Sequence, residues 1–258
     1  MIGIFDSGVG GLASLLAVRE VAPRADLIYY ADEANLPYGE KNESEICRIA
    51  ETVCARLLSE GASVLLAACG TVSSVALPYL QKRFSVPIFG IVEPTAQAVR
   101  DTGIEGDILI LATEASIRAG AFIREIADFA THAPRHTLAC PDFVPMAEEG
   151  RCDPHNPDDR AEAERILAPV MGHSIGTAVL GCTHFSLLRD LIGVCLPGVC
   201  LVDAAREGAR AMLDTLSDRD KEGRGECRLL TSGDPDAFLQ KAKRILEFSR
   251  HTGGVIRS

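Results

Sequence analysis

Residues 63–71, SVLLAACGT, and residues 177–184, TAVLGCTH, decide the fold of this chain. In each stretch an apolar run that fits a buried strand is followed at once by a cysteine and the start of a helical pattern. A strand that leads into a helix is the unit of a parallel α/β sheet, and ligands bind such sheets beyond the carboxyl ends of the strands. Cys69 and Cys182 are therefore predicted to lie at a ligand site, one in each half of the chain.

Short apolar runs alternate with amphipathic segments along the rest of the chain, which predicts an α/β protein with mostly parallel sheets flanked by helices. The expected strands are residues 2–5, 27–31, 64–68, 88–92, 107–112, 137–139, 178–180 and 199–202. The main expected helices are residues 12–21, 43–60, 117–129, 160–171, 204–216 and 235–249.

The two halves resemble each other in the order of their elements, because each contains a strand, a hydroxyl-rich turn and a helix, and later a strand, a cysteine and a helix. This order predicts two similar lobes, each a mostly parallel sheet flanked by helices, with the active site in the cleft between them. Residues 1–95 plus 206–258 are expected to form the first lobe, and residues 96–205 the second.

Composition excludes several classes of partner. The net charge of −10 disfavours nucleic acid or an anionic membrane as the main partner, since both require a basic surface. No run approaches the roughly 18 apolar residues of a membrane span. The nine cysteines form no Cys-x-x-Cys pair, which argues against structural zinc and a disulfide framework and favours the cytoplasm. No metal is expected either, since the sequence shows no clustered His, Asp and Glu set, and nothing indicates a cofactor.

The segment Asp6–Gly11, DSGVGG, directly follows the first expected strand. Its glycines and the helix that follows would allow backbone N–H groups to bind a carboxylate or a phosphate. An alternative stays open, because Gly8–Ala13 also fits the G-x-G-x-x-G/A dinucleotide motif, with Asp32 at the expected distance for ribose binding. This alternative is a nucleotide-binding oxidoreductase. Asp6 and Ser7 argue against it, since they place a carboxylate near the pyrophosphate.

The pair Cys69 and Cys182 suggests proton-transfer chemistry. A single cysteine at either position is as well explained by an inert buried residue. Two thiols at helix starts, facing each other across a cleft, could remove a proton on one side of a carbon and return it on the other. His184, two residues after Cys182, could assist these transfers.

Six motifs together carry a resemblance to glutamate racemases, of the cofactor-independent aspartate/glutamate racemase superfamily. They are FDSGVGGL (5–12), PYGEK (37–41), AACGT (67–71), IRAGAF (117–122), CPDFVPMAEEG (140–150) and VLGCTHFSLL (179–188), with VDAA (202–205) as a further match. The motifs occur in order between positions 5 and 205, so the resemblance covers most of the chain.

The resemblance implies an isomerase that interconverts L- and D-glutamate without a cofactor and supplies D-glutamate for peptidoglycan, in cell wall biogenesis. It implies that Cys69 and Cys182 are the catalytic acid/base thiols, and that Asp6 supports proton transfer at Cys69. His184 and Glu148 correspond to accessory residues on the Cys182 side. The residues implied to contact substrate are Asp6, Ser7, Tyr38, Gly39, Gly70, Thr71, Thr183 and His184. Relatives are often dimers, so a homodimer is a further expectation.

The chain departs from the family pattern after its first cysteine, where Gly70 replaces the usual asparagine of Ala-Cys-Asn-Thr; Asn35 also replaces an arginine of many relatives. A missing amide could leave a substrate group unpaired, at a cost of about 1–3 kcal/mol. The alternatives that follow are a racemase of the same fold with another substrate, a racemase of reduced activity, or a binding protein without turnover.

Overall fold

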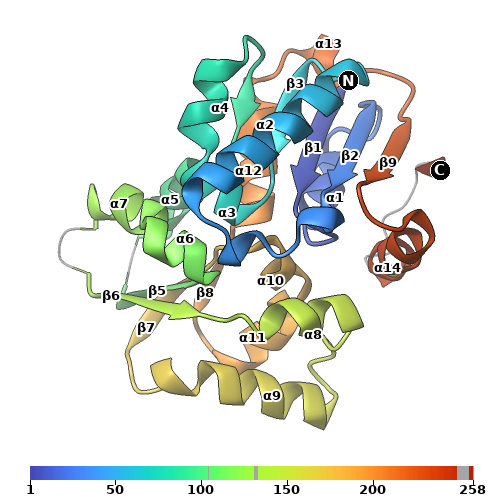
Figure 1. Ribbon diagram of the computed structural model, residues 1–258. Helices are drawn as coiled ribbons and strands as arrows, with labels where there is room; N and C mark the ends of the chain where they lie inside the picture. The colour runs from blue at the N-terminus through green and yellow to red at the C-terminus, as the bar shows by residue number, and fades with distance from the viewer. Residues whose placement is uncertain (104, 131–132, 249–255, 258) are drawn as a thin grey trace.

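Two parallel sheets, one in each of two lobes, form the framework of the protein (Figure 1). The computed structural model describes residues 1–103, 105–130, 133–248 and 256–257. The first sheet has the strand order β10-β9-β2-β1-β3-β4 and the second the order β6-β5-β7-β8, and all described pairings are parallel. The predicted fold class is therefore confirmed.

The strands of the first sheet come from both ends of the chain, and those of the second from its middle. The first sheet contains β1 (Ile2–Asp6), β2 (Leu27–Ala31), β3 (Val64–Ala67), β4 (Ile88–Phe89), β9 (Cys227–Thr231) and β10 (Ile256–Arg257). The second contains β5 (Asp107–Ala112), β6 (Arg135–Ala139), β7 (Ile175–Leu180) and β8 (Cys200–Asp203). The lobe boundaries at residues 95/96 and 205/206 stay a prediction.

Helices cover both faces of both sheets. They are α1 (Leu12–Val21), α2 (Glu43–Ser59), α3 (Gly70–Val75), α4 (Leu77–Arg83), α5 (Val92–Asp101), α6 (Glu114–Ala119), α7 (Ala121–Ala127), α8 (Phe143–Glu149), α9 (Pro157–Leu167), α10 (Thr183–Leu187), α11 (Arg189–Cys195), α12 (Ala204–Thr215), α13 (Asp218–Lys221) and α14 (Pro235–Phe248). Three short 3-10 turns accompany them: η1 (Glu33–Asn35), η2 (Tyr38–Glu40) and η3 (Ala168–Val170). Within the described residues, no helix has both the length and the apolar character needed to cross a membrane.

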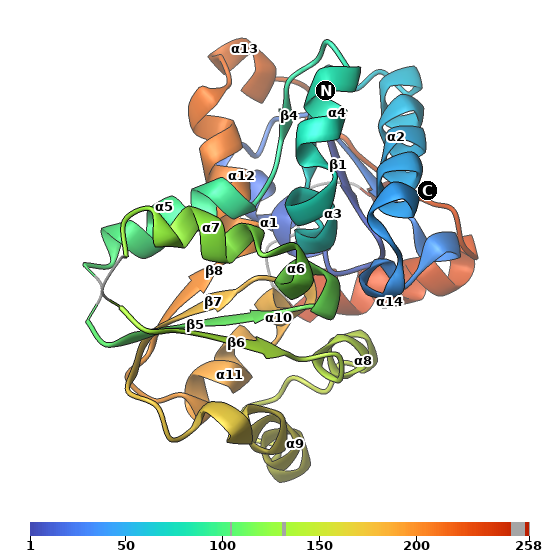
Figure 2. The same cartoon turned by 60° about the vertical axis from the view of Figure 1, so that its left-hand side comes forward.

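The apolar core has three parts, because successive strand residues face opposite sides of a sheet. One face of the first sheet packs against α2, α3 and α4. Its other face packs against α1, α12 and α14, and this core continues through α5 and α7 to the inner face of the second sheet. The outer face of the second sheet is covered by α8, α9 and α11. Figure 2 shows α5 and α7 side by side at the junction of the lobes.

Several elements differ from those expected. The single helix expected over residues 117–129 is two helices, α6 and α7, because Gly120 between them adopts φ +66° in the left-handed region that favours glycine. Helix α8, in residues 143–149, and strand β9 were not expected from the sequence. The last helix ends at Phe248, and Ser249, where its end was expected, lies outside the described residues.

Arg19 on α1 anchors the missed strand β9 beside the start of the chain. Its guanidinium donates to the carbonyl oxygens of Pro23 (2.7 Å), Ala25 (2.9 Å) and Glu226 (3.2 Å), and only 8% of the residue is exposed. Glu226 directly precedes β9, so one buried side chain links α1, the approach to β2 and the entry of β9. Loss of this donor removes a hydrogen bond from the buried Ala25 carbonyl and two from partly buried carbonyls, of which that of Glu226 still accepts from the Leu27 N–H.

We expect Arg19→Met to lower the free energy of unfolding by about 1–3 kcal/mol, because three hydrogen bonds are lost, one of them to the buried Ala25 carbonyl, while the aliphatic packing is kept. Urea denaturation followed by circular dichroism measures the change. Arg24→Met is the matched control: Arg24 is exposed and forms a surface ion pair with Glu222, so its loss should cost about 0.5 kcal/mol or less. Equal losses in both variants would contradict the anchoring role.

Candidate active site

A cavity of about 310 Å³ lies where the carboxyl ends of β1, β3, β5 and β7 meet between the lobes. The residues that line it are Asp6, Ser7, Leu36, Pro37, Tyr38, Gly39, Glu40, Cys69, Gly70, Thr71, Thr113, Glu114, Pro141, Val144, Pro145, Cys182, Thr183 and His184. All of the residues expected from the sequence line it except Glu148, which lies behind His184 and contacts that imidazole instead.

The two cysteines occupy equivalent positions in the two lobes, and both line the cavity. Each is the residue before a short helix, Cys69 before α3 and Cys182 before α10, and they are only 6% and 7% exposed. Burial, followed by the charge of Asp6, raises the pKa of the Cys69 thiol well above its ordinary value. Backbone hydrogen bonds from Val72 and Thr71 lower this pKa, but they do not offset the burial and the charge. This arrangement gives Cys69 a preference for the thiol form.

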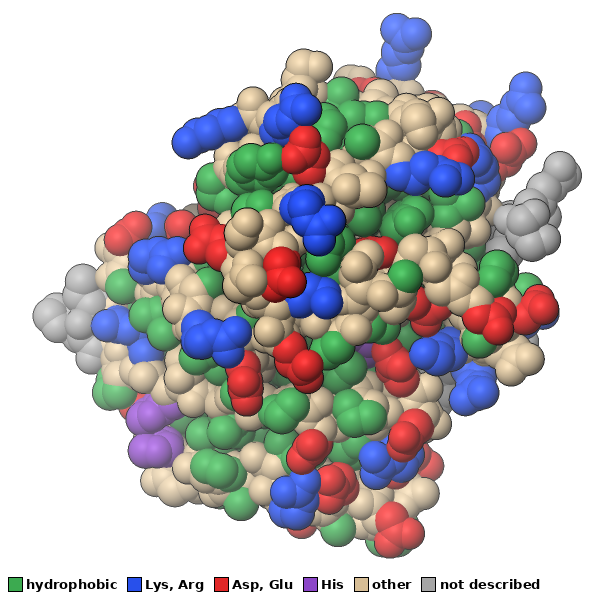
Figure 3. Space-filling view, viewed as in Figure 1, with side chains coloured by type: hydrophobic (Ala, Val, Ile, Leu, Met, Phe, Trp, Pro, Cys, Tyr) green, Lys and Arg blue, Asp and Glu red, His purple; other side chains and the backbone are tan. Residues whose placement is uncertain are grey.

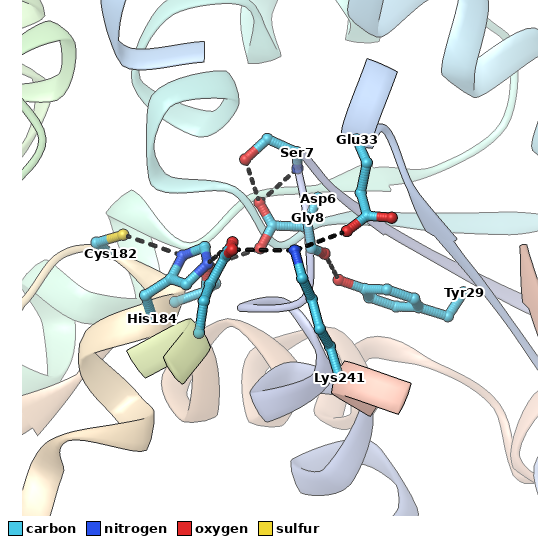
Figure 4. A network of polar contacts seen from close by, with 10 residues as sticks. Asp6, Ser7, Gly8, Tyr29, Glu33, Cys182, His184 and Lys241 are labelled. Carbon is cyan, nitrogen blue, oxygen red and sulfur yellow. Dashed lines mark hydrogen bonds and ion pairs between the residues drawn. The ribbon is translucent and has the colours of Figure 1, made fainter. Parts of the chain in front are cut away.

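His184 forms the polar environment of Cys182. Its Nδ1 lies 3.9 Å from the Cys182 Sγ, and its Nε2 lies 3.3 Å from the Glu148 Oε1 (Figure 4). Burial lowers the pKa of His184, but hydrogen bonds to Cys182 and Glu148 outweigh it and raise the value to about 10. The hydrogen bond from His184 and the charges of His184 and Lys241 lower the pKa of Glu148 to about 2, against its partial burial. The pair is therefore imidazolium and carboxylate at neutral pH.

Asp6 connects the two lobes on the Cys69 side. Its Oδ1 accepts from the backbone N–H of Ser7 at 2.7 Å, and its Oδ2 accepts from the Thr183 hydroxyl at 2.7 Å. Thr183 belongs to the second lobe and directly follows Cys182, so this bond holds one strand end of each lobe together. The Asp6 carboxylate is 1% exposed and keeps a fixed orientation.

The glycine-rich loop packs against side chains of the second lobe. A Cβ on Gly10 would lie 2.5 Å from the His184 Nδ1 and 2.6 Å from the Thr183 Oγ1. The close approach of Thr183 and His184 therefore fills the side of the loop on which a pyrophosphate would have to lie. This packing disfavours the dinucleotide-binding alternative.

Asp32, which that alternative needs for a ribose, has other partners. Its carboxylate accepts from the Tyr38 hydroxyl (2.7 Å), the Asn35 side-chain amide (2.9 and 3.1 Å) and the Ser232 hydroxyl (2.7 Å). These bonds fix the loop that carries η1 and η2. Because the Tyr38 hydroxyl is used in this way, Tyr38 and Gly39 border the cavity with the loop held rigid behind them.

Gly70 marks a close contact between the lobes. A Cβ at this position would lie 2.2 Å from the carbonyl oxygen of Gly181, the residue before Cys182. A side chain here requires the two strand ends to separate. The sequence indicated a missing amide at this position, and the structure adds a steric reason for its absence.

Thr113 is a cavity residue that the sequence did not single out. Its Oγ1 lies 3.0 Å from the Thr71 Oγ1, and it also caps α6 by accepting from the Ser116 N–H at 3.3 Å. Its position in the sequence could have indicated this role, because Thr113 directly follows the expected strand of residues 107–112, much as Cys182 follows β7 after one residue. The two threonines thus place hydroxyl groups from both lobes at one side of the cavity.

Comparison with known proteins shows the family of the chain. A family model described as Asp/Glu/Hydantoin racemase matches residues 15–212. The chain is 40% identical over 250 residues to the glutamate racemase of Thermus thermophilus, covering 95% of this chain and 92% of that protein. It is 38% identical over 257 residues to that of Desulforudis audaxviator, with 95% and 93% covered.

Solved structures give the same relationship. The T. thermophilus glutamate racemase in complex with beta-chloro-D-alanine aligns with a TM-score of 0.84 and 37% identity over 99% of this chain and 95% of that chain. The Escherichia coli glutamate racemase in complex with L-glutamate and the activator UDP-MurNAc-ala aligns with a TM-score of 0.78 and 28% identity, covering 95% and 94%. The chain therefore belongs to the Asp/Glu/hydantoin racemase family. Within that family its relatives are the glutamate racemases, which confirms the resemblance found in the motifs.

We expect Glu148→Gln to lower the pKa of His184 from about 10 toward its ordinary 6.5, because the paired carboxylate is lost. In the wild type, the stabilisation from Glu148 is lost as the pH falls from 4.5 through 2, and that from His184 is lost as the pH rises from 6.5 through 10. The difference in free energy of unfolding between wild type and variant should therefore be largest between pH 4.5 and 6.5.

Urea unfolding at several pH values and an NMR titration of the His184 ring measure these two effects. Glu149→Gln is the control, since the neighbouring Glu149 is exposed and pairs with Arg151. A stability difference that stays constant from about pH 3 to about pH 9 would refute the charged pair.

Proposed function

We infer that the protein interconverts L- and D-glutamate, an isomerase reaction that supplies D-glutamate for peptidoglycan. The observation that carries this inference is the pair of buried thiols, each at the start of a helix, on one cavity between two lobes. In the homologous E. coli structure the ligand is L-glutamate. The kinship with glutamate racemases over 95% of the chain supports the same substrate here.

The reaction we propose removes a proton from one face of the α-carbon and adds a proton to the other face. The thiolate of one cysteine takes the α-proton, and the electron pair of the broken C–H bond stays on the substrate as a carbanion conjugated with its carboxylate. The opposite thiol then donates its proton to the other face of the carbon and becomes the thiolate. Protons balance, no electrons leave the site, and the two thiols supply both groups, so the proposal requires no cofactor.

The two cysteines have different polar neighbours. The His184 Nδ1 lies 3.9 Å from the Cys182 sulfur, where the imidazole can assist proton transfer at that residue. Cys69 is buried beside the Asp6 carboxylate, which raises its thiol pKa. We therefore propose Cys182 as the base and Cys69 as the acid for one enantiomer, with the roles reversed for the other.

Substrate binding has to be achieved without an arginine or lysine, since none is among the residues that line the cavity. We propose that the Thr71 and Thr113 hydroxyl groups, which lie 3.0 Å apart on the cavity, bind a carboxylate. The hydroxyl of Thr183 donates to Asp6 and keeps a lone pair that can accept from the substrate ammonium. Ser7, Tyr38 and Gly39 would complete the contacts.

The remaining expectations concern location and assembly. Catalysis by two reduced thiols suits a reducing compartment, which supports a cytoplasmic enzyme. On the face drawn in Figure 3, basic side chains are interspersed with acidic ones, a pattern that does not favour nucleic acid as a partner. The homodimer stays a prediction.

We expect Cys69→Ala and Cys182→Ala each to reduce racemisation of glutamate by about 10²–10⁴-fold or more, because each removes one of the two proton-transfer groups. Circular dichroism of the purified protein with D-glutamate measures the rate, and in deuterium oxide the wild type should place deuterium at the α-carbon of the product. Cys54→Ala, at a buried cysteine away from the cavity, is the control. Either single variant racemising at the parent rate would exclude the two-thiol mechanism.

We expect Gly70→Asn to slow turnover by up to about 10²-fold rather than to restore a substrate contact, because the new Cβ must displace the Gly181 carbonyl and separate the thiols. Gly70→Ala should act in the same direction. Gly193→Ala, whose Cβ would make an ordinary 3.5 Å contact with Leu201, is the control. A Gly70→Asn protein faster than the wild type would show that the missing amide, and not the close contact, limits the rate.

A further inference from the structure

Lys241 of helix α14 reaches the back of the active site from the C-terminal part of the chain. Its Nζ lies 3.1 Å from the Glu148 Oε2 and 3.4 Å from the Glu33 Oε1 (Figure 4). Glu148 lies on α8, after the strands β5 and β6 of the second lobe, and Glu33 lies on η1, after β2 of the first. One ammonium group therefore bridges two carboxylates that belong to different lobes.

The two oxygen atoms of Glu148 have different partners. Oε1 contacts the His184 Nε2, and Oε2 contacts the Lys241 Nζ. Lys241 is thus one contact away from the imidazole that faces Cys182. A carboxylate held at both oxygen atoms cannot rotate away from the ring, and the bond at one imidazole nitrogen fixes which group the other nitrogen faces.

The position of Lys241 is itself fixed by packing. Phe238, one turn earlier on α14, is 3% exposed and its ring stacks on that of Tyr29 with centroids 6.4 Å apart, and Ala242 is fully buried. Glu33, the second partner, is held by a hydrogen bond from the Thr231 hydroxyl at 3.1 Å. The lysine side chain is 33% exposed and its partners 12% and 20%, so these ion pairs are better shielded than a typical surface pair.

We propose that Lys241 is a positioning residue of the racemase site: it clamps Glu148 across the boundary between the lobes and so holds His184 against Cys182. The proposal rests on the function proposed above. Lys241 does not line the substrate cavity; it lines, with Glu148, a separate cavity of about 540 Å³ behind it. Its effect should therefore appear in turnover and not in substrate binding.

The test compares Lys241→Met, Lys241→Arg and Lys243→Met in the racemisation assay. We expect Lys241→Met to lower kcat by about 2- to 30-fold with KM within about twofold, and Lys241→Arg to recover most of the rate because a cation still bridges the carboxylates. Lys243→Met removes the same charge from an exposed position of the same helix and should leave the rate unchanged. L- and D-glutamate have equal free energies, so kcat/KM must fall by one common factor in both directions.

A double variant separates positioning from a general loss of stability. If Lys241 acts through Glu148, Lys241→Met should slow Glu148→Gln no further, whereas independent effects would multiply. An unchanged kcat in Lys241→Met, an equal fall in Lys243→Met, or multiplying effects in the double variant would each overturn the proposal. The same double-variant cycle can be measured by urea unfolding, which needs no turnover. If Lys241 and Glu148 are coupled in stability but the wild-type protein racemises no glutamate, the proposed function is refuted and the contact between the two residues is not.

A second, independent feature is a cluster of three side chains at the amino ends of strands β5, β6 and β7 in the second sheet. Asp107 begins β5, His136 lies near the start of β6, and His173 lies two residues before β7. The His136 Nε2 is 2.8 Å from the Asp107 Oδ2, the two imidazole rings have centroids 3.8 Å apart, and one ligand atom from each of the three residues lies within 4.8 Å of the others. Figure 3 shows histidine side chains next to each other on the surface of the lower lobe.

We infer that these three residues bind a divalent transition metal ion. Two imidazole nitrogens and one carboxylate oxygen suit Zn²⁺ or Ni²⁺, which bind such ligands at about 2.0–2.2 Å, and water would complete the coordination. The cluster lies at the amino ends of the strands, away from the thiols, so a bound ion would stabilise the lobe without entering the reaction.

Calorimetric titration with NiCl₂ tests this site. Any nickel that the cysteine thiols bind is the same in every variant, so a difference in stoichiometry between variants reports on the histidine cluster. Wild type and the control His155→Ala, at an exposed histidine elsewhere, should show one more site than His136→Ala and His173→Ala. Anomalous diffraction from crystals soaked in NiCl₂ should place the ion between the three side chains. Equal nickel stoichiometry in all four proteins would refute the metal site and leave the cluster as an ion pair between Asp107 and His136 with the His173 ring beside it.

Discussion

The contact between Gly70 and Gly181 is the constraint on which the site depends. A Cβ on Gly70 would reach to 2.2 Å from the Gly181 carbonyl oxygen, so the two strand ends meet backbone to backbone. Cys69 and Cys182 are the chain neighbours of these glycines, and the contact therefore decides that both thiols border one cavity. The bond from Thr183 to Asp6, at 2.7 Å, joins the lobes beside the same place. Backbone proximity and a buried hydrogen bond thus bring together two halves with separate sheets.

The charged groups around this contact are arranged unequally. The Cys182 side has an imidazolium supported by Glu148, and through it by Lys241, whereas the Cys69 side has a buried carboxylate at Asp6. A symmetrical pair of sulfur atoms would have no preferred resting state. The two sulfur atoms have unequal surroundings, and burial beside Asp6 favours the thiol form at Cys69.

The elements that the sequence did not predict share a physical reason. Residues 143–149 form a helix of only two turns, which is marginal by itself, yet Phe143 and Met146 are fully buried against the second sheet and stabilise α8 through packing. Strand β9 is short, and it is defined by pairing with β2 at the other end of the chain and by the buried Arg19. Glu148 was expected from the family motif, but its contact with Lys241 joins residues 93 positions apart.

The sequence by itself determined the parallel α/β class, the two thiols at strand ends and the family, because hydrophobic period, glycine placement and local motifs are written in short stretches of chain. Tertiary structure alone decided how far apart the lobes lie, that Gly70 must lack a side chain, and that Thr113, Lys241 and the cluster of Asp107, His136 and His173 have partners. These features depend on distances between segments remote in sequence, and such distances are set by how the sheets pack and not by any local pattern.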